Sequence, residues 1–405
     1  MPHLLKDPVG DSKGILMLTH KEKAFFQPEV PFMDAAMKEL KKQYVVGMHW
    51  GSPHENIGTL PYIDFHLGST NTLKFAPDVT TPRNTLCARN FLPDCFNKMA
   101  PETRGAKRWD ILSVAGPRRL KRLDELLVVL RKVYDRRPET RTLIICACPN
   151  LSERDPELDY VEIYDDYLKM FSLKEREKFT LMLLEGNQGM PILQEDMAYF
   201  YNQSRIFTLF TNKEGDPRVI PEALLCGLPV VVKKHLAGGG KDYLNEANSR
   251  EFSTLDEAAE VFLDLLRDDC PEVDPNPYQT HLLARHTVPQ LEAWLKELFA
   301  QLDIPYEGTL YADNLVNTLP GHLILTLPPN KRYASSNDLI SHQAALWYVY
   351  QLLNRNILPY ENFALWAFNR GVTGKSYLKQ LLKRPGAAFR KLRLLPPKKY
   401  TRATA

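Results

Sequence analysis

Two glutamates with a chemically useful spacing lie in the segment FTNKEGDPRVIPEALLCGLPVVV, residues 210–232. Seven residues separate Glu214 from Glu222. A short helix is predicted over Pro221–Cys226, because proline is favoured at the first helical position and Gly227 supplies a left-handed cap at the end. The free N–H groups at the start of a helix suit an anion, and carboxylates accept hydrogen bonds from hydroxyls. The segment therefore indicates a ligand that carries both phosphate and hydroxyl groups, such as a nucleotide sugar.

A group of cations follows the apolar run Trp109–Ala115, which predicts a buried strand ending at Gly116. Arg118, Arg119 and Lys121 stand in the turn after that strand. Charge-assisted hydrogen bonds from such cations to a phosphate contribute about 1.5–3 kcal/mol each. The turn therefore suits a departing diphosphate, and the alternative is a solvated basic turn without a ligand.

A third candidate is the glycine-rich loop His235–Gly240, with three consecutive glycines at its end. Glycine allows backbone N–H groups to approach a ligand closely. The alternative is a flexible connector with no ligand.

Predicted strands and helices alternate through the middle of the chain. The expected strands are Trp109–Ala115, Thr142–Ala147, Arg205–Phe210 and Pro229–Val232, and the expected helices are Leu120–Tyr134, Leu173–Glu185, Gln194–Gln203, Pro221–Cys226, Leu255–Arg267 and Val288–Leu302, the last two closing the domain. Alternation of helices with almost wholly apolar strands is typical of a parallel sheet covered on both faces. Ligands of such sheets bind at the carboxyl ends of the strands.

The rest of the chain gives weaker signals. Short strands are expected over Gly14–Leu18, Tyr44–Trp50, Tyr62–Gly68 and Thr85–Leu92, one helix over Pro31–Gln43, and two more helices over Asp338–Leu353 and Tyr360–Leu382.

Residues 205–232, with both glutamates and the run ALLCGLPV, resemble the donor-site motif of the retaining glycosyltransferases of family 4. The stretch Lys107–Leu130 resembles the opening of the same donor domain, with Lys121-Arg122-Leu123-Asp124 in place of its Lys-Gly-Leu-Asp motif. The similarity extends over roughly residues 89–300. It implies an α/β fold of the GT-B kind, with two Rossmann-like domains facing a cleft, a short N-terminal half and a helical, basic C-terminal extension.

The resemblance also implies roles for single residues. Glu214, Lys121 and Arg118 would act in catalysis, together with His66 as the histidine that family members place near the donor sugar. The donor would be bound by a larger set, namely Glu222, Gly116, Arg119, Gly215, Arg218, Val219, Ile220 and Gly239. A UDP- or GDP-sugar would be the substrate, and neither a further cofactor nor a metal is expected.

Several departures from the family pattern leave alternatives open. Pro117 follows Gly116, so that either Arg118 or Arg119 is the phosphate-binding arginine, and Arg118 is favoured. Arg122 replaces the usual glycine. His49 and His54 are alternatives to His66, and any of these histidines is more often structural.

The composition is that of a soluble globular protein, with 44% apolar and 25% charged residues. The six cysteines form no CxxC pair and are expected to be free, buried thiols in a reducing compartment. No apolar run reaches the roughly 18 residues of a membrane span, and the N-terminus has no secretory pattern. A cytoplasmic location is therefore predicted.

Charge is distributed unevenly along the chain. Residues 362–405 contain eleven of the 52 Lys and Arg and none of the 49 Asp and Glu. Within them, LKQLLKRPGAAFRKLRLL over residues 378–395 is basic and amphipathic, which favours an anionic membrane surface. An acidic polymer or partner, or a solvated disordered tail, remains an alternative, whereas nucleic acid is not expected because the body is acidic and has no recognition motif.

The expected organisation is an acceptor-side domain over residues 1–105, a donor-binding domain over 106–300 and an extension over 301–405. The implied activity is that of a retaining, hexosyltransferase-like enzyme of polysaccharide biosynthesis, acting on a glycan or lipid-linked acceptor. Two other readings stay open, a sugar-nucleotide epimerase and a non-catalytic scaffold or glycan-binding protein derived from a transferase.

Overall fold

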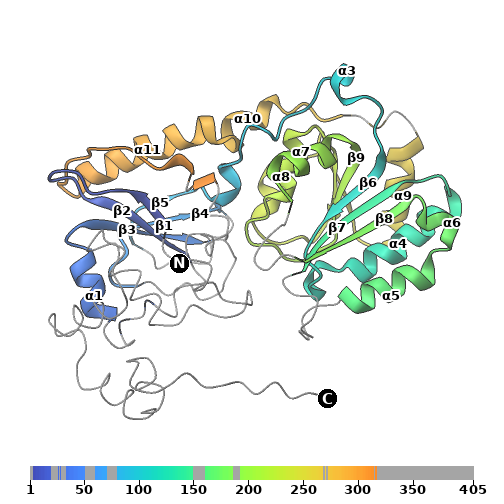
Figure 1. Cartoon of the computed structure of the whole chain (residues 1–405), viewed down its shortest axis with the longest axis horizontal. Helices are drawn as coiled ribbons and strands as arrows, with labels where there is room; N and C mark the ends of the chain where they lie inside the picture. The colour runs from blue at the N-terminus through green and yellow to red at the C-terminus, as the bar shows by residue number, and fades with distance from the viewer. Residues whose placement is uncertain are drawn as a thin grey trace, which may run out of the picture. The chain divides into compact units, whose positions relative to one another are not determined.

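The computed structural model describes residues 3–19, 26, 28, 33–50, 60–70, 80–148, 160–185, 192–267, 270, 272–313 and 315–316 (Figure 1). The helices expected over Asp338–Leu353 and Tyr360–Leu382, the basic segment 378–395 and His54 lie outside the described residues.

The chain divides into two compact units. One consists of Met1–Lys21, Val45–Thr59 and Ile63–Leu339, and the other of Glu22–Tyr44, Leu60–Tyr62 and Ile340–Ala405. The second unit includes helix α1 (Met33–Leu40), whose buried face is formed by Met33, Ala36, Met37 and Leu40. Apart from Tyr44, at the start of β3, both sheets belong to the first unit.

The larger sheet has six strands in the order β11-β10-β9-β6-β7-β8, and every neighbouring pair is parallel. The strands are β6 (Trp109–Val114), β7 (Thr142–Cys148), β8 (Phe179–Glu185), β9 (Ser204–Leu209), β10 (Val230–Lys233) and β11 (Ser249–Phe252). The chain proceeds from β6 towards one edge and then returns to the centre at β9 to proceed towards the other. This is the doubly wound order, in which the topological switch point lies between β6 and β9.

Helices cover both faces of this sheet (Figure 1). The helices α4 (Leu123–Arg136), α5 (Tyr160–Met170) and α9 (Leu255–Arg267) pack together, and so do α7 (Gln194–Asn202) and α8 (Val219–Leu225). One apolar core joins them to the strands. On α4 the buried residues recur at helical spacing, for example Leu123, Leu126, Leu127 and Leu130, so its apolar face sets its orientation.

The smaller sheet has five strands in the order β1-β2-β3-β4-β5. These are β1 (His3–Lys6), β2 (Gly14–Thr19), β3 (Tyr44–Trp50), β4 (Phe65–Gly68) and β5 (Arg83–Asn84). β3, β4 and β5 are parallel neighbours, whereas β1 and β2 form an antiparallel hairpin. The expected α/β class with a short first half is confirmed, although the hairpin makes the first sheet mixed.

The last long helix in the described part packs on the smaller sheet. Helices α10 (Asn276–Leu282) and α11 (Ala284–Gln301) follow one another, and Leu291, Leu295 and Phe299 of α11 share a core with residues of β1 to β4. The sequence predicts that this helix closes the donor domain. Its apolar face is buried by the other sheet instead, as Figure 1 also shows for α11 beside β1 and β2.

Two predicted elements differ in type. A helix was expected over Leu173–Glu185, but the structure has a one-turn helix, α6 (Leu173–Arg176), followed by strand β8. A short apolar run such as TLMLL fits a buried strand as well as a helix, and only its neighbours decide between them. The strand expected over Thr85–Leu92 is instead an irregular stretch with a 3-10 turn, η2 (Ala88–Asn90), and helix α5 was not predicted.

Three further observations bear on the sequence predictions. Among the described residues no helix is long and apolar enough to cross a membrane. Of the cysteines whose side chains are described, Cys87, Cys95, Cys146, Cys226 and Cys270 are all free thiols, and Cys95 and Cys270 are only partly buried.

Candidate functional site

The switch point of the larger sheet brings together two of the predicted residues. Lys121 follows β6 and Glu214 follows β9, and these strands are parallel neighbours, so their carboxyl ends lie side by side. The Lys121 ammonium forms an ion pair with Glu214 Oε1. The side chains are only 20% and 9% exposed, so the pair is largely shielded from water.

The loops that carry this pair are joined by the hydroxyl of Thr211. It donates to the carbonyl of Leu120 at 3.0 Å, and it also lies 2.9 Å from the carbonyl of Lys213. The turn after β6 and the turn after β9 are therefore fixed relative to each other independently of the ion pair.

The basic turn after β6 is a 3-10 turn, η3 (Arg119–Lys121), in which Arg118 is the preceding residue. Arg118 and Arg119 are exposed. Arg122 adopts a left-handed conformation with φ 53°, which costs a non-glycine residue about 1–2 kcal/mol. The backbone thus takes at Arg122 the conformation that glycine favours, although the side chain is that of arginine.

Gly116 lies between the buried strand and this turn. A Cβ built there would have its nearest contact 3.7 Å away, at the carbonyl of Ala147. Glycine is therefore not required by the fold at this position, which leaves room for a ligand to approach its backbone.

Glu222 is held differently from Glu214. It lies on α8, and its Oε2 accepts a hydrogen bond of 3.0 Å from the Tyr201 hydroxyl. Arg218 Nε lies 3.6 Å from its Oε1. Burial raises the pKa of Glu222, against the opposing effects of Arg218 and Tyr201.

Helix α8 begins at Val219, two residues before the predicted start at Pro221. Pro221 still falls in the first turn, where its missing N–H needs no partner. At the other end, Gly227 has φ 80°. Its N–H donates to Leu224 and the N–H of Leu228 donates to Ala223, which is the Schellman arrangement expected of a glycine cap.

The glycine-rich loop packs against the Glu214 loop. The N–H of Glu214 donates to Ala237 at 2.8 Å, and the N–H of Gly239 donates to Gly215 at 3.0 Å. A Cβ at Gly238 would lie 1.7 Å from the carbonyl oxygen of Glu214. The glycines therefore allow two loops to meet, and the N–H of Gly239 is already used in that contact.

His66 lies inside β4 and is fully buried. Its Nδ1 lies 2.7 Å from the Thr81 hydroxyl, and its ring stacks 6.1 Å from that of Trp50. Burial, together with the nearby Arg83, lowers the pKa of His66 to about 4. This is the environment of a core histidine, which was the structural alternative.

The structure also shows a buried charge cluster that the sequence analysis did not predict. Arg89 Nε lies 3.2 Å from Asp216 Oδ1, and its Nη2 donates to Asp242. His49 Nε2 accepts the N–H of Ala88 at 3.1 Å and lies 3.8 Å from Asp216. The only sequence signal was the position of Asp216, two residues after Glu214.

Charge balance within this cluster is set by the same contacts. Burial opposes ionisation of Asp216, but His49 and Arg89 outweigh it and hold the pKa of this carboxyl below its usual value. Burial, reinforced by Asp216, raises the pKa of the Cys87 thiol. Cys87 is therefore a neutral donor, whose Sγ lies 3.1 Å from Asp216 Oδ1.

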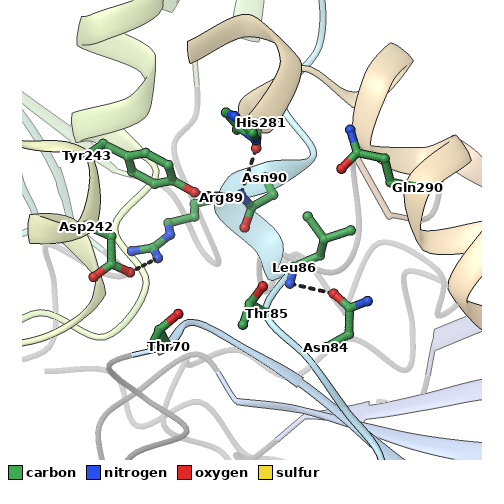
Figure 2. A pocket seen from close by; sticks show the side chains of 10 residues that line it. All are labelled: Thr70, Asn84, Thr85, Leu86, Arg89, Asn90, Asp242, Tyr243, His281 and Gln290. Carbon is green, nitrogen blue, oxygen red and sulfur yellow. Dashed lines mark hydrogen bonds and ion pairs between the residues drawn. The ribbon is translucent and has the colours of Figure 1, made fainter. Parts of the chain in front are cut away.

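A hollow of about 410 Å³ lies beside this cluster (Figure 2). Most of its lining is polar, and it comes from the segments around β4, β5 and η2, from the turn η4 (Gly239–Tyr243) and from α10 and α11. The lining residues are Thr70, Asn84, Thr85, Leu86, Arg89, Asn90, Asp242, Tyr243, His281 and Gln290. None of the residues predicted to act in catalysis lines it.

Among the described residues, no group of three or more His, Cys, Asp or Glu is arranged to hold a metal ion.

No family model matches the chain, and no curated protein matches it. Similar solved structures include several glycosyltransferases. One is the pneumococcal O-GlcNAc transferase GtfA, in complex with UDP and GlcNAc, at 14% identity and a TM-score of 0.48 over 68% of this chain and 55% of that one. Another is a glycosyltransferase from Rickettsia africae, at 13% identity and a TM-score of 0.47 over 67% and 82%. A third is a trehalose-6-phosphate synthase, at 13% identity and a TM-score of 0.48 over 73% and 76%.

These similarities are distant, and at such TM-scores they carry no inference about activity. The chain spans about half the length of GtfA and of the Staphylococcus aureus protein TarM.

Proposed function

We propose that the protein transfers a sugar from a nucleotide-sugar donor to a hydroxyl group of an acceptor. The observation that carries the proposal is the Lys121–Glu214 ion pair at the carboxyl ends of β6 and β9. The switch point of a doubly wound sheet is where such folds bind nucleotides. A cation and a carboxylate at that point match the two polar parts of a nucleotide sugar, its diphosphate and its hydroxyls.

The transfer requires little covalent chemistry from the protein. The bond between the sugar C1 and the diphosphate oxygen breaks, the acceptor oxygen bonds to C1, and the acceptor proton passes to the departing diphosphate. In this proposal Lys121 and the exposed Arg118 neutralise that diphosphate, and Arg119 is adjacent. Groups aimed at developing charge are usually the largest contribution to catalysis.

The ion pair also explains how Lys121 and Glu214 tolerate burial before the donor binds. An unpaired buried charge is costly, and each residue compensates the other. When the donor enters, phosphate would replace Glu214 as the partner of Lys121, and sugar hydroxyls would replace Lys121 as the partners of Glu214.

We assign the ribose hydroxyls to Glu222, whose carboxylate can accept two hydrogen bonds. Backbone groups of Gly116, Gly215 and the first turn of α8, from Arg218 through Val219 to Ile220, would complete the donor site, with Gly239 supporting the Glu214 loop. The attack on the same face as the departing diphosphate, and hence retention of configuration, belongs to this proposal, as does a glycan or lipid-linked acceptor.

Calorimetric titration with UDP, GDP and ADP tests the donor site. We expect one nucleotide to bind, and we expect Glu222→Gln to weaken its binding by about tenfold or more, since a carboxylate accepts both ribose hydrogen bonds. The exposed Glu246, changed to Gln, is the matched control. Binding of no nucleotide by the intact protein would exclude the transferase and favour a non-catalytic protein, while turnover of a nucleotide sugar without an acceptor would favour an epimerase.

A further inference from the structure

We propose that the hollow in Figure 2 binds a neutral, polyhydroxylated ligand, namely a sugar unit of the acceptor glycan. Naming this ligand as the acceptor rests on the proposed function. The class of ligand rests only on the residues of the hollow.

The polar groups in the floor of the hollow are held in place by hydrogen bonds to one another. Asn90 Nδ2 donates to the Tyr243 hydroxyl at 2.6 Å and to the carbonyl of His281 at 2.8 Å. Asn90 Oδ1 accepts the N–H of Cys87 at 3.0 Å. Figure 2 shows how Asn90 joins these segments. A ligand would therefore meet a fixed surface here and would not need to order it, which lowers the cost of binding.

The guanidinium in the floor of the hollow is already paired with carboxylates. The guanidinium of Arg89 contacts two carboxylates, those of Asp216 and Asp242, and it lies 4.9 Å from the centre of the Tyr243 ring. Two carboxylates thus face this one positive charge. The hollow therefore differs in chemistry from the cationic turn after β6.

Side chains at the rim of the hollow have hydrogen-bond donors and acceptors that are available to a ligand. Asn84 Oδ1 accepts the N–H of Leu86 at 2.8 Å, which leaves its Nδ2 as a donor. Gln290 Nε2 donates to Thr280 at 3.1 Å, which leaves its Oε1 as an acceptor. Within the described part of the chain, the hydroxyl of Thr85 has no hydrogen-bond partner.

This combination matches hydroxyl groups, each of which is at once a donor and an acceptor. Leu86 is the one aliphatic residue of the lining, so a lipid tail would find little apolar surface. The volume of about 410 Å³ is in the range of small-molecule sites. A sugar fits all three properties better than a nucleotide, a lipid or an inorganic anion.

The hollow is connected to the donor site through one short loop. Asp216, which contacts Arg89 on the floor, lies two residues after Glu214. Gly239 packs against the same arginine, because a Cβ there would lie 2.5 Å from Arg89 Nη1. A sugar in the hollow would thus be adjacent to the loop that carries Glu214, which is where an acceptor is needed.

Ligand-detected NMR on the full chain, without nucleotide, tests the proposal. The probes are methyl glucoside, methyl galactoside and N-acetylglucosamine, each at high concentration, with inorganic phosphate as the anionic comparison. The variants Thr85→Val and Gln290→Leu remove one hydroxyl and one carboxamide from the rim. The exposed Thr180→Val on β8 and Gln301→Leu at the end of α11 are matched controls.

We expect at least one neutral sugar to give saturation transfer, the rim variants to weaken it at least about fivefold, and the controls to leave it unchanged. Binding that survives both rim variants, or no sugar binding at all, would overturn the proposal. Nucleotide binding is measured in a separate experiment. If no nucleotide binds, the proposed transferase function is excluded, but the result for sugar binding in the hollow still stands. The nucleotide-sugar donor is then added. If no glycosyl group is transferred to the sugar bound in the hollow, the hollow binds a free sugar and is not the acceptor site.

Discussion

Single side chains at the switch point determine what the site can do. Lys121 stands out because it is a cation largely shielded from water whose ion-pair partner is Glu214, the residue that we propose contacts the donor sugar. An ammonium in such a site acts more strongly on phosphate than it would in water, because the surroundings are less polarisable.

Replacing this ammonium tests the proposed role most directly. We expect Lys121→Met to lower kcat by about 10²–10³ while the protein remains folded. The measurement is turnover of the nucleotide sugar identified by calorimetry, with circular dichroism to check folding. The exposed Lys174→Met on α6 is the control. Turnover within about twofold of the unaltered protein would exclude Lys121 from the reaction.

His66 gives a prediction about pH. Its pKa in the folded protein is lowered to about 4, mainly by burial, against an ordinary value near 6.5. Between these values the unfolded chain binds a proton that the folded protein does not. Stability should therefore fall as the pH falls from about 6.5 to about 4, by up to roughly 3 kcal/mol from this group.

Urea unfolding at pH 7, 6 and 5 would measure this effect. His66→Gln should reduce the dependence of the unfolding free energy on pH, whereas the exposed His235→Gln should leave it unchanged. An unchanged slope in His66→Gln would mean that this imidazole is accessible to protons in the folded state, as a catalytic histidine would be.

Arg122 gives a second test at the residue scale. Because its φ is 53°, glycine should be better tolerated than alanine there, the reverse of the usual helix preference. We expect Arg122→Gly to be more stable than Arg122→Ala by about 1 kcal/mol in urea unfolding. Both variants lose the exposed ion pair with Glu125, so that loss cancels in the comparison, and equal stability would show that the turn relaxes.

Among the elements, α8 shows how a short helix positions a site. It has seven residues, so its own backbone hydrogen bonds contribute little to its stability. Its position depends on burial of Ile220, Ala223, Leu224 and Leu225 and on the Schellman cap at Gly227. The cap therefore supports Glu222 from a distance.

The cap can be tested with two alanine variants. At Gly227, φ is 80° and a Cβ would lie 2.8 Å from Lys98 and 3.2 Å from the carbonyl of Val273. At Gly105, φ is 67° but no atom lies within 4 Å of a Cβ. Backbone strain should lower the free energy of unfolding of Gly227→Ala and of Gly105→Ala by about 1–2 kcal/mol each. Gly227→Ala should lose more stability, because its Cβ also meets neighbouring atoms. Equal losses of stability in urea unfolding would mean that Lys98 and Val273 move away from the new Cβ without a cost in free energy.

The elements also show what the sequence could and could not predict. The strands β6, β7, β9 and β10 were predicted to within a few residues because they are short, almost wholly apolar runs, and the helices α4 and α9 because their apolar residues recur at helical spacing. β8 was predicted as helix because a short apolar run fits a buried helix as well as a buried strand. The contact between Lys121 and Glu214 follows from two strand ends meeting, whereas the Arg89–Asp216 cluster depends on packing between segments far apart in the chain.

For the whole molecule, the uneven charge is the feature that remains to be tested. The segment 378–395 lies outside the described residues, and its attraction to an anionic membrane stays a prediction from sequence. Each Lys or Arg near such a surface contributes about 1 kcal/mol. Deletion of residues 378–405 should therefore abolish sedimentation with phosphatidylserine vesicles, with phosphatidylcholine vesicles as the control. Unchanged sedimentation would exclude this segment as the anchor.

The packing of α11 on the smaller sheet has a consequence for the order of folding during synthesis. Leu5 of β1 shares a core with Leu295 and Phe299, and the carbonyl of Leu5 accepts the N–H of Tyr311 at 2.7 Å. Strand β1 therefore waits for residues made about 300 positions later. The larger sheet, all of whose strands are complete by Phe252, can form in the meantime. The smaller sheet would then become resistant to protease later than the larger sheet, although domains usually fold from the N-terminus onwards.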